Sequence, residues 1–180
     1  TKPGLHAIEE LIDRGINVNV TLLFSIARYE AVADAYLLGL EARLRRGQPL
    51  SGICSVASFF VSRIDSLIDK QLQSLAAQGD TDIAQHARAL LGTIAVANAK
   101  LAYQRYLALF GSPRFRILAA AGARTQRLLW ASTSTKNPAY PDTLYVDELI
   151  GPETVNTLPP ETVKAFIDHG SAAETLTHDL

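Results

Sequence analysis

Side chains that could hold a phosphorylated, hydroxyl-rich ligand stand at or near the ends of three expected β-strands. They are Asn19 and Thr21 in the first strand, Ser58, Phe60 and Arg63 at and just beyond the second, and Ser132 and Lys136 at and just beyond the third. Hydroxyl and amide groups pair with the hydroxyls of a polyol, a guanidinium forks onto a phosphate, and an ammonium adds a point charge. The set therefore predicts a site for a phosphorylated polyol.

Each of these residues also has a structural explanation. An arginine at the start of a helix is more often solvated or paired with a carboxylate, here Asp65 or Glu30. Residues 132–135 are all Ser or Thr and could simply bond to the local backbone. Cys54, early in a strand with no histidine near it in sequence, is expected to be a small core residue. The four histidines lack metal-ligand spacing, so no metal is expected.

The first strand, expected over residues 16–21, alternates apolar and polar side chains within apolar surroundings. Alternation places Asn17, Asn19 and Thr21 on one face of the strand. We expect these three polar groups to point into an interior, where they must bond one another or line a polar site. Asn17, at the N-terminal end of the strand, is expected to support stability and not the site.

The elements expected along the chain alternate between strands and helices. Further strands are expected over 53–60, 127–132 and 154–157, and helices over 4–14, 26–46, 64–110 with a break near 78–81, 115–121, 145–149 and 160–169. This order predicts an α/β fold with parallel strands. No glycine-rich phosphate loop follows a strand, which favours a (β/α)8 TIM barrel over a doubly wound sheet. Because a whole barrel has eight strands, the chain is expected to supply about half of one, as one partial barrel domain over residues 1–180.

Composition narrows the class of partner. The chain has 180 residues, a net charge of −1 and one cysteine, Cys54. It lacks a basic patch and a long apolar run, so neither a nucleic acid nor a membrane is expected as a partner. A cytoplasmic location is expected. The chain contains no methionine and opens in a loop before a helix, which indicates a piece of a longer protein.

Five stretches resemble the bacterial transaldolase family. They are GINVNVTLLFS at 15–25, SVASFFVSRID at 55–65, ANAKLAYQRY at 97–106, QRLLWASTSTKNP at 126–138 and LYVDELIGPETVNTLP at 144–159. The resemblance implies a (β/α)8 barrel, of which this chain supplies roughly the second half. It also implies transfer of a dihydroxyacetone unit between sugar phosphates through a lysine Schiff base, in the pentose phosphate pathway. The implied substrates are of the fructose 6-phosphate, erythrose 4-phosphate and sedoheptulose 7-phosphate class. No cofactor is implied.

The resemblance also assigns roles to the candidate residues. Asn19 matches an asparagine that holds a hydroxyl of the bound dihydroxyacetone, and Thr21 matches a threonine that orients the catalytic water. Ser58 matches a substrate-contacting serine, and Phe60 the aromatic wall beside it. Arg63, Ser132 and Lys136 match the phosphate end of the site.

The family's Schiff-base lysine precedes a threonine that aligns with Thr1, so the lysine is expected just upstream of this chain. Lys2 follows that threonine and does not match the nucleophile. The 180 residues alone are therefore expected to be inactive. One alternative is a non-catalytic half barrel that binds sugar phosphate or associates with a complementary half. Another is a fructose 6-phosphate aldolase, against which the long helical stretch 64–110 counts.

Overall fold

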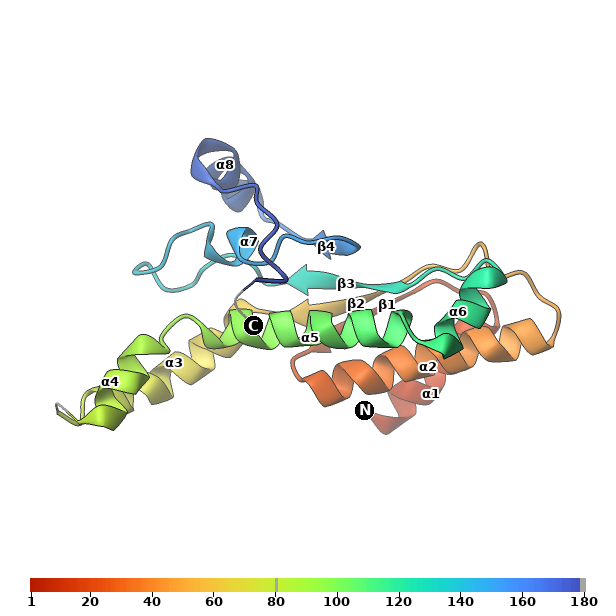
Figure 1. Cartoon of the computed structure of the whole chain (residues 1–180), viewed down its shortest axis with the longest axis horizontal. Coiled ribbons are helices and arrows are strands. Elements are labelled where there is room, and N and C mark those ends of the chain that lie inside the picture. The colour runs from red at the N-terminus through yellow and green to blue at the C-terminus, as the bar shows by residue number, and fades with distance from the viewer. Residues whose placement is uncertain (80, 179–180) are drawn as a thin grey trace. The chain divides into compact units, whose positions relative to one another are not determined.

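The computed structural model describes residues 1–79 and 81–178, and the order of its elements can be followed in Figure 1. The strands are β1 (Val18–Leu23), β2 (Ser55–Phe60), β3 (Gln126–Ala131) and β4 (Thr154–Asn156). The helices are α1 (Lys2–Asp13), α2 (Ile26–Arg45), α3 (Ser62–Ala76), α4 (Asp82–Ala89), α5 (Ile94–Phe110), α6 (Pro113–Ala120), α7 (Leu144–Asp147) and α8 (Pro160–His169). Among the described residues, none of these helices is long and apolar enough to cross a membrane.

The strands form a four-stranded sheet in the order β1-β2-β3-β4. Strands β1 and β2 are parallel, with Val18 opposite Ser55 and Val20 opposite Ala57. Neighbours in the sheet are thus consecutive in sequence and joined by helical connections, as in a (β/α) barrel. The α/β class with parallel strands is confirmed, and the strands correspond to half of the eight that a complete barrel contains.

The chain divides into two compact units. Unit 1 comprises residues 1–59 and 102–129, and unit 2 comprises residues 60–101 and 130–180. The division passes through β2 and β3, so each unit holds one part of those two strands. The prediction of a single domain over 1–180 stays a prediction.

In unit 1, polar side chains tie the first residues of three strands together. The Gln126 amide donates to Ser55 Oγ at 2.8 Å, and Ser55 Oγ donates to the Val18 carbonyl at 2.7 Å. Gln126 and Ser55 are buried. Helix α1 packs against α2 in the same unit, as Figure 1 shows. Buried polar groups that are bonded in this way fix the alignment of the strands.

Unit 2 is organised around α3, which packs against α4. The polar residues Ser62, Asp65 and Asp69 of α3 are buried, whereas Leu67 is 61% exposed. Two buried carboxylates on one helix need hydrogen-bond donors close by. The tyrosines Tyr140 and Tyr145 supply them, as described below.

The stretch expected as two helices over 64–110 forms three. The break near 78–81 is present, and Thr81 caps α4 by accepting from the Ala84 amide at 3.2 Å. Asp80, the other expected cap, lies outside the described residues. A second break at residues 90–93 was not expected; Gly92 there has φ +74°, a conformation that favours glycine.

The prediction that β1 lies in deeply buried surroundings is wrong for this structure. Asn19 and Thr21 are exposed, and so are Ile16 and Leu22, which are 48% and 56% exposed. The strand also begins at Val18 and runs on to Leu23. The physical reason is that β1 stands at the end of the sheet order and, among the strands that the structure describes, is hydrogen-bonded to β2 alone. Cys54, expected in the core, is half-buried.

Candidate functional site

Asn19 and Ser58 meet on neighbouring strands of unit 1. Ser58 Oγ donates to Asn19 Oδ1 at 2.7 Å. Ser58 is buried and Asn19 is exposed, so the buried serine hydroxyl fixes the rotamer of the exposed Asn19 side chain. The Nδ2 group of Asn19 has two further hydrogens to donate, which suits it to hold a hydroxyl oxygen of a ligand.

Asn17 has a different task at the start of the same segment. Its Oδ1 accepts from the Cys54 amide at 2.8 Å, just ahead of β2. This bond satisfies a backbone donor at a strand entrance, which is a structural role. Asn17 therefore belongs with the sheet and not with the ligand-facing groups.

Thr21 lies at an irregularity in β1. The register between β1 and β2 shifts between Val20 and Leu23, and Leu22 has φ +62°. Such a bulge redirects a side chain, and a positive φ at a bulky residue is rare. Thr21 lines an open cavity that also includes Thr1 and Arg28. The local backbone is thus bent at the residue expected to orient a water.

In unit 2, the segment after β2 is joined to the end of β3. The Val61 amide donates to the Ala131 carbonyl at 3.0 Å, and the Ser62 amide donates to the Ser132 carbonyl at 3.0 Å. The hydroxyls of Ser62 and Ser132 are 2.9 Å apart. Ser132 has φ +59°, so the chain turns sharply at the strand end where the candidate serine stands.

Arg63 and Phe60 are brought together at the start of α3. The Arg63 guanidinium lies 4.8 Å from the centre of the Phe60 ring, within reach of a cation–π contact. Arg63 is exposed. Both alternative partners are engaged elsewhere, Glu30 with Arg105 and Asp65 with Tyr145. The N-cap residue Val61 makes no side-chain capping bond, and the Ser62 amide is bonded to the Ser132 carbonyl, so the positive charge at the start of α3 comes from the Arg63 guanidinium.

Lys136 follows in the loop after β3. It is exposed, and its Nζ donates to Ser134 Oγ at 2.6 Å. Arg63, Ser132 and Lys136 all belong to unit 2 together with Phe60, whereas Asn19, Thr21 and Ser58 belong to unit 1. The chemistry expected of the phosphate end is thus carried by unit 2.

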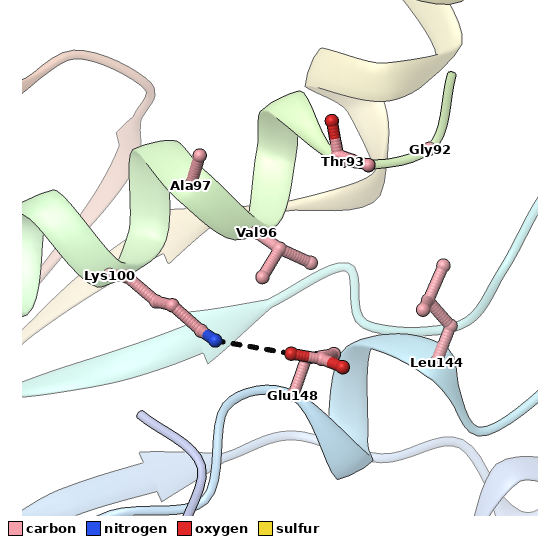
Figure 2. A pocket seen from close by; sticks show the side chains of 7 residues that line it. All are labelled: Gly92, Thr93, Val96, Ala97, Lys100, Leu144 and Glu148. Atoms are coloured by element: carbon pink, nitrogen blue, oxygen red, sulfur yellow. Dashed lines mark hydrogen bonds and ion pairs between the residues drawn. The ribbon is translucent and has the colours of Figure 1, made fainter. Parts of the chain in front are cut away.

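Figure 2 shows a different pocket of unit 2, which contains none of the candidate residues. Its buried Lys100 donates to Glu148 Oε2 at 3.2 Å and to the His178 carbonyl at 3.0 Å. The other lining residues shown are Gly92, Thr93, Val96, Ala97 and Leu144. An ammonium held by a carboxylate and a carbonyl ties α5, the end of α7 and residue 178 together, which is a structural role.

Sequence reasoning missed a buried network on α3. Asp65 accepts from the Tyr145 hydroxyl and the Ala95 amide, both at 2.7 Å. Asp69 accepts from the Tyr140 hydroxyl at 2.7 Å and from the Gly92 amide at 3.1 Å. Burial raises the pKa of Asp65 above its usual value, and burial together with the bond to Asp69 raises the pKa of Tyr140 to about 12. The available signal was the spacing 62, 65, 69, which places three polar residues on one face of a helix.

The fold and the candidate residues define a (β/α)-barrel type of protein with polar and cationic side chains near the ends of its strands. Residues 1–180 match the family described as transaldolase/fructose-6-phosphate aldolase. The chain belongs to this family.

Curated transaldolases are close relatives of the chain. Transaldolase 1 of Streptomyces avermitilis is 58% identical over 170 residues, which are 94% of this chain and 43% of the relative. Transaldolase 2 of Nostoc punctiforme is 53% identical over 182 residues, covering 100% of this chain and 48% of the relative. The transaldolase of Trichodesmium erythraeum is 55% identical over 173 residues, or 94% of this chain and 45% of the relative. The chain spans about half the length of these relatives.

Proposed function

We propose that the chain carries the sugar-phosphate-binding part of a transaldolase. The whole protein would transfer a dihydroxyacetone unit between sugar phosphates in the pentose phosphate pathway, through a lysine Schiff base. The observation that carries the proposal is the start of α3, where exposed Arg63 follows Ser62, whose amide and hydroxyl are both bonded to Ser132. Family membership supports the same conclusion.

The candidate residues would have three roles: holding the dihydroxyacetone unit, orienting a water molecule and binding the phosphate. Asn19, oriented by Ser58, would hold a hydroxyl of the dihydroxyacetone unit, and Phe60 would offer an apolar surface to the substrate. Thr21 would orient the water that moves protons as the carbinolamine forms and collapses. Arg63, Ser132 and Lys136 would bind the phosphate, with Arg63 as the fork and Lys136 as the point charge.

The nucleophile completes the proposal. We propose that the Schiff-base lysine precedes Thr1, so the 180 residues alone bind substrate without forming the covalent intermediate. The acceptors would be aldose phosphates of the erythrose 4-phosphate class. A cytoplasmic location belongs to the same proposal, because sugar phosphates are intracellular metabolites.

Borohydride trapping tests the placement of the lysine. The 180-residue chain is incubated with fructose 6-phosphate and borohydride, which reduces a Schiff base to a stable amine, and its intact mass is measured. We expect no adduct. An adduct that peptide mapping places on a lysine of this chain, Lys100 and Lys136 included, would show that the nucleophile lies within it.

Binding tests the phosphate end separately. Arg63→Gln should weaken the binding of fructose 6-phosphate to the chain about tenfold, because a charge-assisted bidentate contact is lost. Arg116→Gln, which removes an exposed arginine of α6, is the matched control and should leave the affinity unchanged. Equal affinities for the two variants would contradict the proposed role of Arg63. If the 180-residue chain binds fructose 6-phosphate and forms no adduct, the chain by itself behaves as a non-catalytic half barrel, as the proposal expects.

A further inference from the structure

The loop after β3, residues 132–143, has to be held in place if its polar side chains are to meet a ligand. It contains Ser132 at its start and Lys136 in its middle. Its own internal bonds are short-range: the Ala139 amide donates to Asn137 Oδ1 at 3.0 Å, and the Tyr140 amide donates to the Asn137 carbonyl at 3.1 Å. These bonds form a local turn and do not attach the loop to the rest of unit 2.

The start of the loop is attached by Ser132, which is bonded to Ser62, and by buried Thr133, whose hydroxyl donates to Asn156 Oδ1 at 2.8 Å. Beyond Lys136, the side chain of Tyr140 makes a further attachment. Its hydroxyl donates to Asp69 Oδ2 at 2.7 Å, and the second oxygen of Asp69 accepts from the Gly92 amide at 3.1 Å. Asp69 is only 6% exposed, so both of its oxygens are used in a place that water barely reaches. A buried carboxylate with two donors is a specific and directional anchor.

Gly92 makes room for the tyrosine ring. A Cβ on Gly92 would lie 2.9 Å from Cζ of Tyr140, closer than two such carbons can stand. The φ of Gly92, +74°, also favours glycine. The unexpected break between α4 and α5 therefore leaves space for the Tyr140 ring, and its Gly92 amide is the second donor to Asp69.

Asp65 provides the neighbouring anchor. It stands one turn before Asp69 on α3, and it accepts from the Tyr145 hydroxyl of α7 and from the Ala95 amide near the start of α5. Near the C-terminal end of the loop, His169 Nε2 and Asp142 Oδ1 are 2.8 Å apart at the surface. Helix α3 thus carries Arg63 in its first turn and, on a buried face, the two carboxylates that hold the segment after β3.

We propose that Asp69 and Tyr140 are positioning residues for the phosphate end of the site. Their bond, next to Gly92, holds the part of the loop that follows Thr133, so that Lys136 meets the same phosphate as Arg63 and Ser132. The inference rests on the proposed function, because it assumes that these three residues bind a phosphate ester. Neither Asp69 nor Tyr140 touches the ligand; both act through the loop.

Chemical footprinting of Lys136 tests this inference directly. Acetylation of Lys136 by a limiting reagent is followed by mass spectrometry with and without fructose 6-phosphate, and exposed Lys164 on α8 serves as an internal reference. In the unsubstituted chain the sugar phosphate should slow the acetylation of Lys136 relative to Lys164. In Tyr140→Phe, which keeps the ring and loses the hydroxyl, this protection should fall and the affinity should drop about tenfold.

A matched variant separates positioning from general destabilisation. Tyr36→Phe also removes a tyrosine hydroxyl, one that donates to the Arg124 carbonyl at 2.8 Å in unit 1. It should leave the protection of Lys136 unchanged even if it lowers the melting temperature as much as Tyr140→Phe. Asp69→Asn, which retains one oxygen acceptor, should give an intermediate loss of protection.

The outcomes distinguish this inference from the function on which it rests. If Arg63→Gln weakens binding while Tyr140→Phe leaves both affinity and Lys136 protection intact, the positioning role is wrong and the phosphate site stands. If the unsubstituted chain binds no sugar phosphate, or Arg63→Gln has no effect, the proposed function fails and this inference fails with it.

Discussion

The contact between Asn19 and Ser58 joins an exposed residue to a buried one. Ser58 Oγ is the donor and Asn19 Oδ1 the acceptor, at 2.7 Å, while Ser58 is only 2% exposed. Loss of either partner leaves the other without this hydrogen bond. Water can then reach the exposed Asn19 amide but not the buried Ser58 hydroxyl. The free-energy cost of a lost hydrogen bond depends on which group remains buried.

We therefore expect Asn19→Ala to destabilise the chain more than Ser58→Ala, although Asn19 is the exposed residue. Asn19→Ala leaves the buried Ser58 hydroxyl without its acceptor, at a cost of about 1–3 kcal/mol, whereas after Ser58→Ala the amide of Asn19 can turn to solvent at a cost of about 1 kcal/mol or less. Urea unfolding of both variants measures the difference. The reverse order would mean that the serine contributes mainly through packing.

At the level of single residues, sequence alone could identify the candidates but not their partners. Asn19, Ser58, Arg63 and Ser132 stand out because polar types follow strand patterns. The Asp69–Tyr140 contact joins positions far apart in the chain, and no local period links them. Asp69 in a helix that also carries Lys70 looks like part of a solvated face until the tertiary structure shows that it is buried.

Helix α3 is bonded to α5 and α7 through the carboxylate of Asp65, and burial disfavours the ionised form of this carboxylate. Burial raises the pKa of Asp65 more than the bonds from Tyr145 and the Ala95 amide lower it, and the charge of Asp69 adds to the increase. Because the folded pKa exceeds the unfolded one, the contribution of Asp65 to stability is fully present below the unfolded value of about 3.9 and is lost as pH rises through the folded value.

Replacement of Asp65 by asparagine should remove this loss. We expect the free energy of unfolding of Asp65→Asn, relative to that of the unsubstituted chain, to increase as pH rises from about 4 to about 7. Urea unfolding at several pH values provides the measurement. Asp82→Asn, at the exposed first turn of α4, controls for the loss of one negative charge. A difference independent of pH would mean that Asp65 titrates alike in the folded and unfolded states.

Sequence predicts an element's bounds closely where local signals mark its ends, and less closely where tertiary pairing sets them. Helix α8 was expected over 160–169 and is found there, because Pro160 starts it and Gly170 follows it. Strand β1 was displaced by two residues at each end, since its boundaries depend on pairing with β2 and on the irregularity at Leu22. The break at 90–93 was missed because Leu90 and Leu91 continue a helical composition and only Gly92 marks the turn.

At the scale of the whole molecule, β1 is an end strand of the sheet that the described residues form. It is first in the order β1-β2-β3-β4; its residue Leu22 is 56% exposed, and Ile16 and Phe24, just outside its two ends, are 48% and 39% exposed. An edge strand with apolar side chains is a template for pairing with another chain. The relatives, about twice as long as this chain, contain further residues that could cover such an edge.

We expect the 180-residue chain by itself to associate through β1. Sedimentation velocity over a range of concentrations should show dimers or larger species, because the unpaired backbone groups and apolar side chains of the edge are satisfied by a second copy. Ile16→Lys should shift the population toward monomer, because a charge placed just before an edge strand opposes its pairing. Ile167→Lys, at a position 80% exposed on α8, is the matched control and should leave the association unchanged. If Ile167→Lys dissociates the chain and Ile16→Lys does not, the associating surface lies on α8, and β1 is stable as a free edge.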